Sequence, residues 1–442
     1  MKATGQKASA PDGHPAGSGP GRLRVALDVR SVRSHREGIG NYALALAEGL
    51  AELLGTRERG EGLGPEPALR QADAGSPDPQ PEIDIWMLGD RHTDWDALPA
   101  FPHRSGPDGP LWHAWAAVTA GRIADVYHST GSYFAPLLTA TPVVLTVHDI
   151  VALRHPTTQS RWTRLTQGAL GLALRKARVV LAVSTFTARE VASEFPGVAG
   201  KIHPVLHAAR RLESLGRVEA ASRDRLEAPW MYEPSLLGQA RRSSELPAPG
   251  AGEAPPDLPP DLPPDLPLAF ILAVGSLEPR KNLVTLLRAH ARMAAPPPLV
   301  LVGHRRWRGA ELDRALADHP HAVRILTDVP DAQLAWLYAT CSVFAFPSRY
   351  EGFGLPVLEA MSCGAPVVAS RASAIPEAAG DAALLFDPDD PGELASLLGR
   401  VLADPGLRAE LVERGRVRAA GRSWTDVARE TVKLYERATM SP

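Results

Sequence analysis

The chain has 442 residues, too many for one typical hydrophobic core, and this length predicts two domains. Lysine and arginine total 48 while aspartate and glutamate total 50, a balance that argues against a general nucleic-acid binder, whose phosphate contacts need a surplus of cations. With Cys341 and Cys363 as the only cysteines and no long apolar run, we expect a cytoplasmic protein without a disulfide framework or a membrane span.

The predicted elements alternate between strands and helices along both halves of the chain. Residues 1–21 are polar, rich in glycine and proline and without the apolar core of a signal peptide, so we expect a disordered tail. In the first half, strands are expected at 23–29, 83–88, 143–147 and 179–183, and helices at 42–54, 111–122, 161–176 and 185–194. In the second half, strands are expected at 269–274, 299–302, 323–326, 343–346, 367–369 and 383–386, and helices at 283–293, 310–317, 331–341, 355–363 and 391–402.

This pattern predicts two doubly wound α/β domains. The strands are apolar throughout, which is typical of parallel sheets covered by helices on both faces. The predicted N-terminal domain covers 22–209 with a loop insertion at about 56–82, and the C-terminal domain covers 268–422. Residues 210–267 end in a Pro-Pro-Asp-Leu repeat and are interpreted as an interdomain insertion, while 423–442 form a helix that can pack back on the first domain. Ligands of such folds bind beyond the carboxyl ends of the strands, here in a cleft between the domains.

The segment from Ser348 to Gly364 carries a predicted anion site. A strand ends just before it, Gly352 and Gly354 allow a tight turn, and a short helix starts at Leu355 with its free N–H groups directed out of the sheet edge. Such a helix start suits a diphosphate. Glu351 and Glu359 flank it and could accept hydrogen bonds from the hydroxyls of a sugar and a ribose. The alternative is a capped structural helix with two solvated glutamates.

A second strand–loop–helix unit runs from Val274 to Asn282. Gly275 and Ser276 follow the strand, and Arg280 and Lys281 precede a helix that Asn282 could cap. Either cation could neutralise a diphosphate that gains charge as it leaves. The alternative is a surface charge pair beside a helix cap.

These motifs resemble a known family. The run from Ser348 to Gly364, with its two glutamates eight residues apart, resembles the signature of the family 4 (group 1) retaining glycosyltransferases, and Gly275 to Asn282 resembles their phosphate-binding loop. The resemblance extends more loosely to the first half of the chain, at Gly38-Ile39-Gly40-Asn41-Tyr42, Tyr127-His128-Ser129, Val147-His148-Asp149 and Val183-Ser184-Thr185-Phe186.

The resemblance implies a GT-B architecture, in which two Rossmann-like domains face each other across a cleft. It implies that Glu359 binds the ribose, that Glu351 and His148 contact the transferred sugar, and that Lys281 contacts the diphosphate. Backbone amides of Phe353, Gly354 and Leu355 would approach the diphosphate or sugar, and the loop with Gly38 and Gly40 would lie near phosphate and acceptor. Many members carry an arginine in place of Ser276, so either Arg280 shares that work or the charge compensation of the phosphate is weaker. His128 is expected to be structural.

The implied substrates are a nucleotide-sugar donor and a glycan, lipid-linked or small-molecule acceptor, as in polysaccharide biosynthesis. The form Gly-Ser-Leu-Glu-Pro-Arg-Lys-Asn looks closest to mannosyltransferase-like members and favours GDP-mannose over a UDP-sugar. The sequence contains no metal-ligand constellation, and we expect neither a metal nor a cofactor. Peripheral contact with the inner face of a membrane is compatible with the sequence, although no clear amphipathic basic helix supports it.

Three alternatives remain open at this point. Another GT-B enzyme, such as a sugar phosphorylase or a nucleotide-sugar epimerase, would share the same motifs. A nucleotide-sugar-binding protein without catalysis would also keep them. A dinucleotide oxidoreductase is disfavoured, because no Gly-x-Gly-x-x-Gly follows the first strand and Val357 occupies the third glycine position after Gly352 and Gly354.

Overall fold

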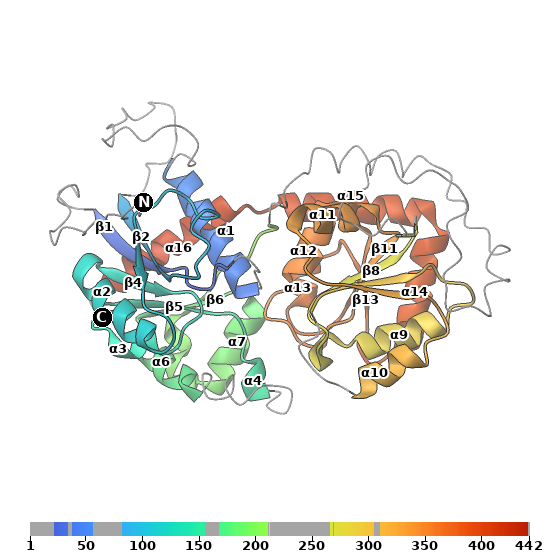
Figure 1. Ribbon diagram of the computed structural model, residues 1–442, viewed down its shortest axis with the longest axis horizontal. Coiled ribbons are helices and arrows are strands. Elements are labelled where there is room, and N and C mark those ends of the chain that lie inside the picture. The colour runs from blue at the N-terminus through green and yellow to red at the C-terminus, as the bar shows by residue number, and fades with distance from the viewer. Residues whose placement is uncertain are drawn as a thin grey trace, which may run out of the picture.

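The computed structural model describes residues 22–33, 38–55, 82–154, 168–210, 212, 266–267, 269–304 and 310–440. These residues form two α/β lobes that stand side by side (Figure 1). The expected tail at 1–21 lies outside the described residues, as do nearly all of the loop at 56–82 and of the insertion at 210–267. The first part of the helix expected at 161–176 also lies outside them.

The first lobe is built on a seven-stranded sheet of order β3-β2-β1-β4-β5-β6-β7, with every neighbouring pair parallel. Its strands are β1 (Leu23–Asp28), β2 (Ile83–Asp90), β3 (His103–Gly106), β4 (Val126–Ser129), β5 (Val143–Val147), β6 (Val179–Ala182) and β7 (Ile202–Pro204). The helices between them are α1 (Gly38–Leu53), α2 (Leu111–Ile123), α3 (Ala135–Leu138), α4 (Val151–Arg154), α6 (Leu170–Lys176), α7 (Thr185–Glu194) and the 3-10 helix η2 (Pro196–Lys201).

The second lobe repeats this plan on a six-stranded parallel sheet of order β10-β9-β8-β11-β12-β13. Its strands are β8 (Ile271–Val274), β9 (Leu299–Val302), β10 (Val323–Leu326), β11 (Val343–Phe346), β12 (Val367–Ser370) and β13 (Leu384–Phe386). Its helices are η4 (Pro279–Lys281), α9 (Leu283–Ala291), α10 (Ala310–Ala317), α11 (Asp331–Thr340), α12 (Leu355–Ser362), α13 (Ile375–Ala379), α14 (Pro391–Ala403) and α15 (Pro405–Ala420). The expectation of two doubly wound parallel sheets is confirmed.

Period-2 packing of the strands explains why both faces of each sheet are covered. In β1, Val25 and Leu27 belong to a core shared with α1, whereas Ala26 faces the core beneath α2 and α6. In β8, Leu272 packs toward α11 and α12, whereas Ile271 packs toward α9 and α14. Each strand is therefore apolar on both sides, which is the pattern that predicted parallel sheets.

Three strands of the first sheet were not predicted. Strand β3 is an edge strand of exposed polar residues, and β7 has three residues and ends in Pro204. Strand β4 is fully buried but contains His128 and Ser129, which hide its apolar character. His128 is structural as expected, because its Nδ1 lies 2.8 Å from the hydroxyl of Tyr435 and its Nε2 lies 2.8 Å from Oγ1 of Thr146.

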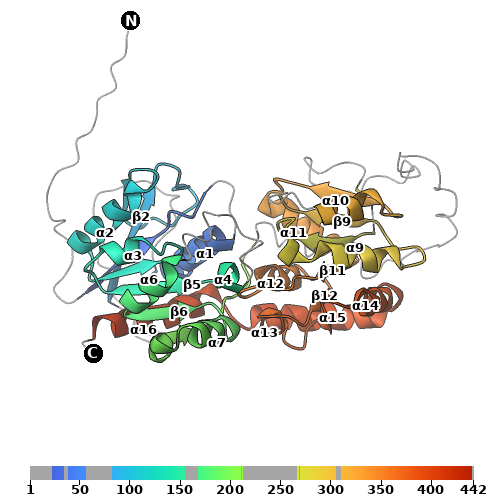
Figure 2. The same cartoon turned by 90° about the horizontal axis from the view of Figure 1, so that it is seen from below.

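The last helix, α16 (Trp424–Thr439), belongs spatially to the first lobe although it follows the second in sequence. It packs against α1 and the strands β4, β5 and β6. Figure 2 shows α16 from below as part of the first lobe, close to β6. A capping box of Ser423 and Asp426 fixes its start. Just before it, Nε of Arg422 donates to the carbonyl of Leu206 at 2.8 Å, which ties together the two segments that leave and enter the first lobe.

Candidate active site

A cleft of about 2050 Å³ separates the lobes and is lined by the loops that follow β1, β5, β8 and β11. The carboxyl ends of the strands point into it, as expected for doubly wound sheets. The residues predicted as site residues all line this cleft: Gly38, Gly40, His148, Gly275, Ser276, Arg280, Lys281, Glu351, Phe353, Gly354, Leu355 and Glu359.

Topology brings the two C-terminal motifs together. Strands β8 and β11 are neighbours at the point where the strand order of the second sheet reverses, so the loops after them meet above the sheet edge. Gly275 adopts φ 144° after β8, and Gly354 adopts φ 111° at the N-cap of α12, conformations that favour glycine. Gly303, after β9, lies so close that an added Cβ would be 2.1 Å from the carbonyl oxygen of Gly275.

Glu351 is clamped between two cations. Nζ of Lys281 donates to its Oε1 at 2.6 Å, and the guanidinium of Arg280 donates to its Oε2 at 3.0 Å. Glu351 is 9 % exposed and Lys281 is 8 % exposed, so this ion pair is largely shielded from solvent. Burial alone would raise the pKa of Glu351, but the charges of Lys281 and Arg280 outweigh it and lower that pKa to about 2. The carboxylate is therefore ionised and fixed in orientation.

The neighbouring side chains complete this charge arrangement. Glu278 accepts from Arg280 at 2.7 Å and from the hydroxyl of Ser276 at 2.7 Å. Ser276 is therefore linked to the cation of Arg280 through the carboxylate of Glu278, which both side chains contact. Asn282 was expected to cap the following helix, but its side chain makes no capping bond. Its Nδ2 donates instead to the carbonyls of Pro347 at 3.1 Å and Pro388 at 2.8 Å, which joins two loops of the lobe.

Glu359 lies on α12 and is 4 % exposed. Nε of Arg210 donates to its Oε1 at 2.9 Å, and the hydroxyl of Tyr338 donates to its Oε2 at 3.4 Å. Arg210 also forms a fork with Asp331, with bonds of 2.7 and 3.3 Å. No sequence pattern marks Arg210, because it stands alone at the boundary of the predicted insertion.

His148 follows β5 on the opposite wall of the cleft. Its Nε2 lies 2.7 Å from the carbonyl oxygen of Thr130, which can only accept, so Nε2 carries the proton. Burial lowers the pKa of His148 to about 4, although that hydrogen bond opposes the shift. The ring is therefore neutral near pH 7, and its Nδ1 is an acceptor. The adjacent Asp149 accepts from the backbone N–H of Val151 at 3.0 Å and so supports the short helix α4.

The two lobes touch directly beside this histidine. A Cβ added to Gly352 would lie 1.7 Å from the carbonyl oxygen of His148, so only glycine fits the contact. The carbonyl of Gly352 accepts from the hydroxyls of Ser184 at 2.6 Å and Thr187 at 3.0 Å. In addition, Glu377 accepts from the first backbone N–H groups of α7, at 2.8 and 3.1 Å. The sequence pattern did not reveal these contacts across the cleft.

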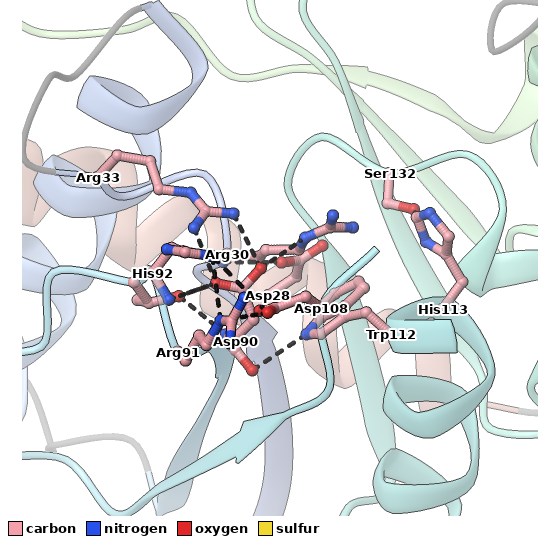
Figure 3. Close-up of polar contacts among 12 residues, drawn as sticks. Asp28, Arg30, Arg33, Asp90, Arg91, His92, Asp108, Trp112, His113 and Ser132 are labelled. Carbon is pink, nitrogen blue, oxygen red and sulfur yellow. Dashed lines mark hydrogen bonds and ion pairs between the residues drawn. The ribbon is translucent and has the colours of Figure 1, made fainter. Parts of the chain in front are cut away.

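Figure 3 shows the polar cluster that anchors the segment after β1. Asp90, at the end of β2 and 1 % exposed, accepts two bonds of 2.9 Å from Arg33 and one of 3.1 Å from Arg30. Burial opposes ionisation of Asp90, but the hydrogen bonds and charge of Arg33, helped by the bond from Arg30, keep the pKa of Asp90 below its usual range. Gly38 and Gly40 follow this anchored segment in the sequence. They were expected in a loop, but both lie in the first turn of α1.

The described ranges contain no group of three histidine, cysteine, aspartate or glutamate side chains placed to hold a metal ion. Across the same ranges, no helix combines the length and the apolar character needed to cross a membrane.

Family models match both lobes. The model described as "Glycosyltransferase Family 4" matches residues 36–207, and the model described as "Glycosyl transferases group 1" matches residues 269–404.

Curated relatives match the chain over part of their length. The chain is 38% identical over 173 residues to O-antigen chain mannosyltransferase B of Escherichia coli, covering 38% of this chain and 45% of the relative. It is 40% identical over 181 residues to the MMP alpha-(1->4)-mannosyltransferase of Mycolicibacterium hassiacum, covering 38% and 43%. It is 36% identical over 176 residues to the D-inositol 3-phosphate glycosyltransferase of Corynebacterium jeikeium, covering 37% and 42%. The matched part spans less than half the length of each of these relatives.

Solved structures share the fold over nearly the whole chain. The sucrose-phosphate synthase of Thermosynechococcus elongatus superposes with a TM-score of 0.61 at 19% identity, covering 94% of this chain and 99% of that one. The Anabaena protein HepE in complex with UDP-glucose superposes with a TM-score of 0.60 at 17% identity, covering 93% and 99%.

Proposed function

Because the chain belongs to the family 4 (group 1) glycosyltransferases and has the GT-B fold, we propose that it transfers a hexose from a nucleotide-diphosphate sugar to an acceptor hydroxyl, with retention of anomeric configuration. The observation that carries the proposal is the fixed carboxylate of Glu351 between Lys281 and Arg280 at the wall of the cleft. A buried pair of cations beside a helix start is suited to the charge of a leaving diphosphate.

In the proposed donor complex, Lys281 and Arg280 contact the diphosphate, together with the backbone around Phe353, Gly354 and Leu355 at the start of α12. Glu351 accepts hydroxyls of the transferred sugar, and Glu359 accepts those of the ribose. Both cations can keep their bonds to Glu351 while binding phosphate, since an ammonium group has three donors and a guanidinium has five.

In the proposed reaction, the acceptor oxygen forms a bond to the anomeric carbon while the bond from that carbon to the phosphate oxygen breaks. Positive charge develops on the sugar, and negative charge on the diphosphate is stabilised by Lys281 and Arg280. The acceptor proton passes to an oxygen of the leaving phosphate. Both oxygens of Glu351 already accept from cations, which favours a positioning role for it over a nucleophilic one. The neutral ring of His148 offers Nδ1 to a sugar hydroxyl.

We propose mannose as the sugar and GDP-mannose as the donor, in preference to a UDP-sugar. The motif from Gly275 to Asn282 supports this choice, as do two relatives that are named as mannosyltransferases. For the acceptor we propose a hydroxyl-rich glycan, a lipid-linked glycan or a small molecule, bound between the first turn of α1 at Gly38 and Gly40 and the anchored Arg33. The proposed site of action is the cytoplasm, peripheral to the inner membrane face where the acceptor is lipid-linked.

A thermal-shift panel tests the donor assignment. A ligand that binds only the folded state raises the melting temperature. We expect stabilisation by GDP and GDP-mannose exceeding that by UDP, UDP-glucose, UDP-N-acetylglucosamine and NAD, and loss of this effect in Glu359→Ala. The matched control is Glu410→Ala, a half-exposed helical glutamate paired with Arg414 in the same lobe, which should respond like the wild type. Stabilisation by NAD alone, or by no nucleotide sugar, would overturn the proposal.

A further inference from the structure

Arg210 is the last residue of the segment that leaves the first lobe after β7, yet its side chain is buried in the second lobe. It is 6 % exposed and lines the cleft. Its three hydrogen bonds reach two different helices, α12 through Glu359 and the first turn of α11 through Asp331. A guanidinium is a rigid planar fork, so these bonds fix the Glu359 carboxylate relative to α11.

We infer that Arg210 is a positioning residue for Glu359 and that it sets the selectivity of the nucleotide site for ribose over deoxyribose. This inference rests on the proposed function, because it takes Glu359 as the carboxylate that receives the ribose hydroxyls. Arg210 acts through Glu359 and does not itself touch the ribose.

The chemistry of Glu359 explains the effect. An ionised carboxylate has about four lone-pair sites and can only accept hydrogen bonds. Arg210 and Tyr338 occupy one site on each oxygen, which leaves acceptor sites for the O–H groups of a ribose diol. The guanidinium of Arg210 pairs with this buried carboxylate, and its bonds to Asp331 hold it in place beside Glu359. A sugar without the 2′-hydroxyl leaves a buried acceptor unpaired, which is how polar sites reject analogues that lack a hydroxyl.

The position of Arg210 in the chain adds a link to the arrangement of the lobes. Four residues earlier, the carbonyl of Leu206 accepts from Arg422, which precedes α16 on the second crossing between the lobes. The residue that aligns Glu359 is therefore carried by the interdomain connection and not by the nucleotide-binding lobe itself. The orientation of the Glu359 carboxylate therefore depends on the relative position of the two lobes.

Calorimetric titration with a ribonucleoside diphosphate and its 2′-deoxy form tests the inference. The probes are GDP and 2′-deoxy-GDP, or UDP and 2′-deoxy-UDP where the uridine series is the one that binds. We expect the wild type to prefer the ribo form by roughly tenfold to a hundredfold, as for loss of one hydrogen bond to a charged group. We expect Glu359→Gln and Arg210→Met to reduce this preference to a similar small value. The double variant should lose no more than either single one.

Two further variants keep the test decisive if Arg210→Met does not fold. Arg210→Lys retains the charge without the fork, and Asp331→Asn loosens Arg210 without altering Glu359 itself; both should give an intermediate ribose preference. A merely structural Arg210 would weaken both nucleotides equally in its variants and leave the preference unchanged, which overturns the inference while the proposed function stands. Absence of any nucleotide binding by the wild type overturns the proposed function and this inference together.

Discussion

Replacing Lys281 with methionine removes one of the two cations that hold Glu351 while keeping most of the side-chain volume. The lost bond is short, 2.6 Å, and both partners are less than a tenth exposed. A hydrogen bond to a charged group contributes about 1.5–3 kcal/mol. Arg280 still neutralises Glu351 at 3.0 Å, so the variant should fold with a free energy of unfolding about 2 kcal/mol lower.

The effect on ligand binding should depend on the phosphates. Lys281 is proposed to contact the diphosphate. Loss of a charge-assisted hydrogen bond of about 1.5–3 kcal/mol should lower the affinity for a nucleoside diphosphate about tenfold to a hundredfold, since each factor of ten corresponds to about 1.4 kcal/mol. Affinity for the corresponding monophosphate should change little. Turnover should fall about a hundredfold to a thousandfold, because charge on the leaving group is greatest in the transition state.

The assay is calorimetric titration of wild type and Lys281→Met with GDP, GMP, UDP and UMP. Lys433→Met is the matched control, since Lys433 is exposed on α16 and far from the charge cluster in sequence. A folded Lys281→Met that binds the diphosphate as tightly as the wild type would refute the assignment of this lysine, and with it the phosphate site after β8.

Two further predictions concern contacts inside and between the lobes. Gly352→Ala should lower turnover at least a hundredfold, because its Cβ would meet the carbonyl oxygen of His148 at 1.7 Å. The control Gly399→Ala, in α14 with open space around it, should keep activity and gain stability. Equal activities of the two variants would contradict the contact. Burial lowers the pKa of His128 to about 3 and of His290 to about 4, so the unfolded chain takes up protons below pH 6.5 that the folded protein refuses. His148, whose pKa burial lowers to about 4, acts in the same direction, whereas Asp28, whose pKa burial raises to about 7, acts against them. Together these four groups should lower the free energy of unfolding by about 3 kcal/mol between pH 7 and pH 5 in urea titrations, and a flat profile would show that the rings are not buried and neutral.

Local pattern was sufficient to predict that the loops after β8 and β11 line the cleft. Strands β8 and β11 are short apolar runs, and each is followed by glycine and a charged loop, so the doubly wound topology brings together the loops that carry Lys281 and Glu351. The ion pair between the two side chains was not predicted. The start of α12 was predicted for the same reason, because Gly354 and Pro356 mark a helix N-terminus in any context.

Contacts that depend on distant partners were not predictable in this way. Arg210 and Glu377 act across the lobes, and neither stands in a periodic pattern that marks its partner. Strand β4 was missed because His128 looks polar in sequence, although Tyr435 satisfies it from a helix more than 300 residues later. Asn282 occupies a cap position by pattern, but two carbonyls of neighbouring loops compete for its side chain.

Acceptor-dependent formation of nucleoside diphosphate is the most direct test of glycosyl transfer by this protein. The purified chain is incubated with GDP-mannose and a panel of glycan, lipid-linked and polyol acceptors, and free GDP is measured beside Glu351→Gln. The account predicts GDP release that requires an acceptor, produces a mannosylated product of retained configuration, and falls at least a hundredfold in the variant. Release at equal rates from wild type and Glu351→Gln, or donor consumption that yields an epimerised nucleotide sugar, would contradict it.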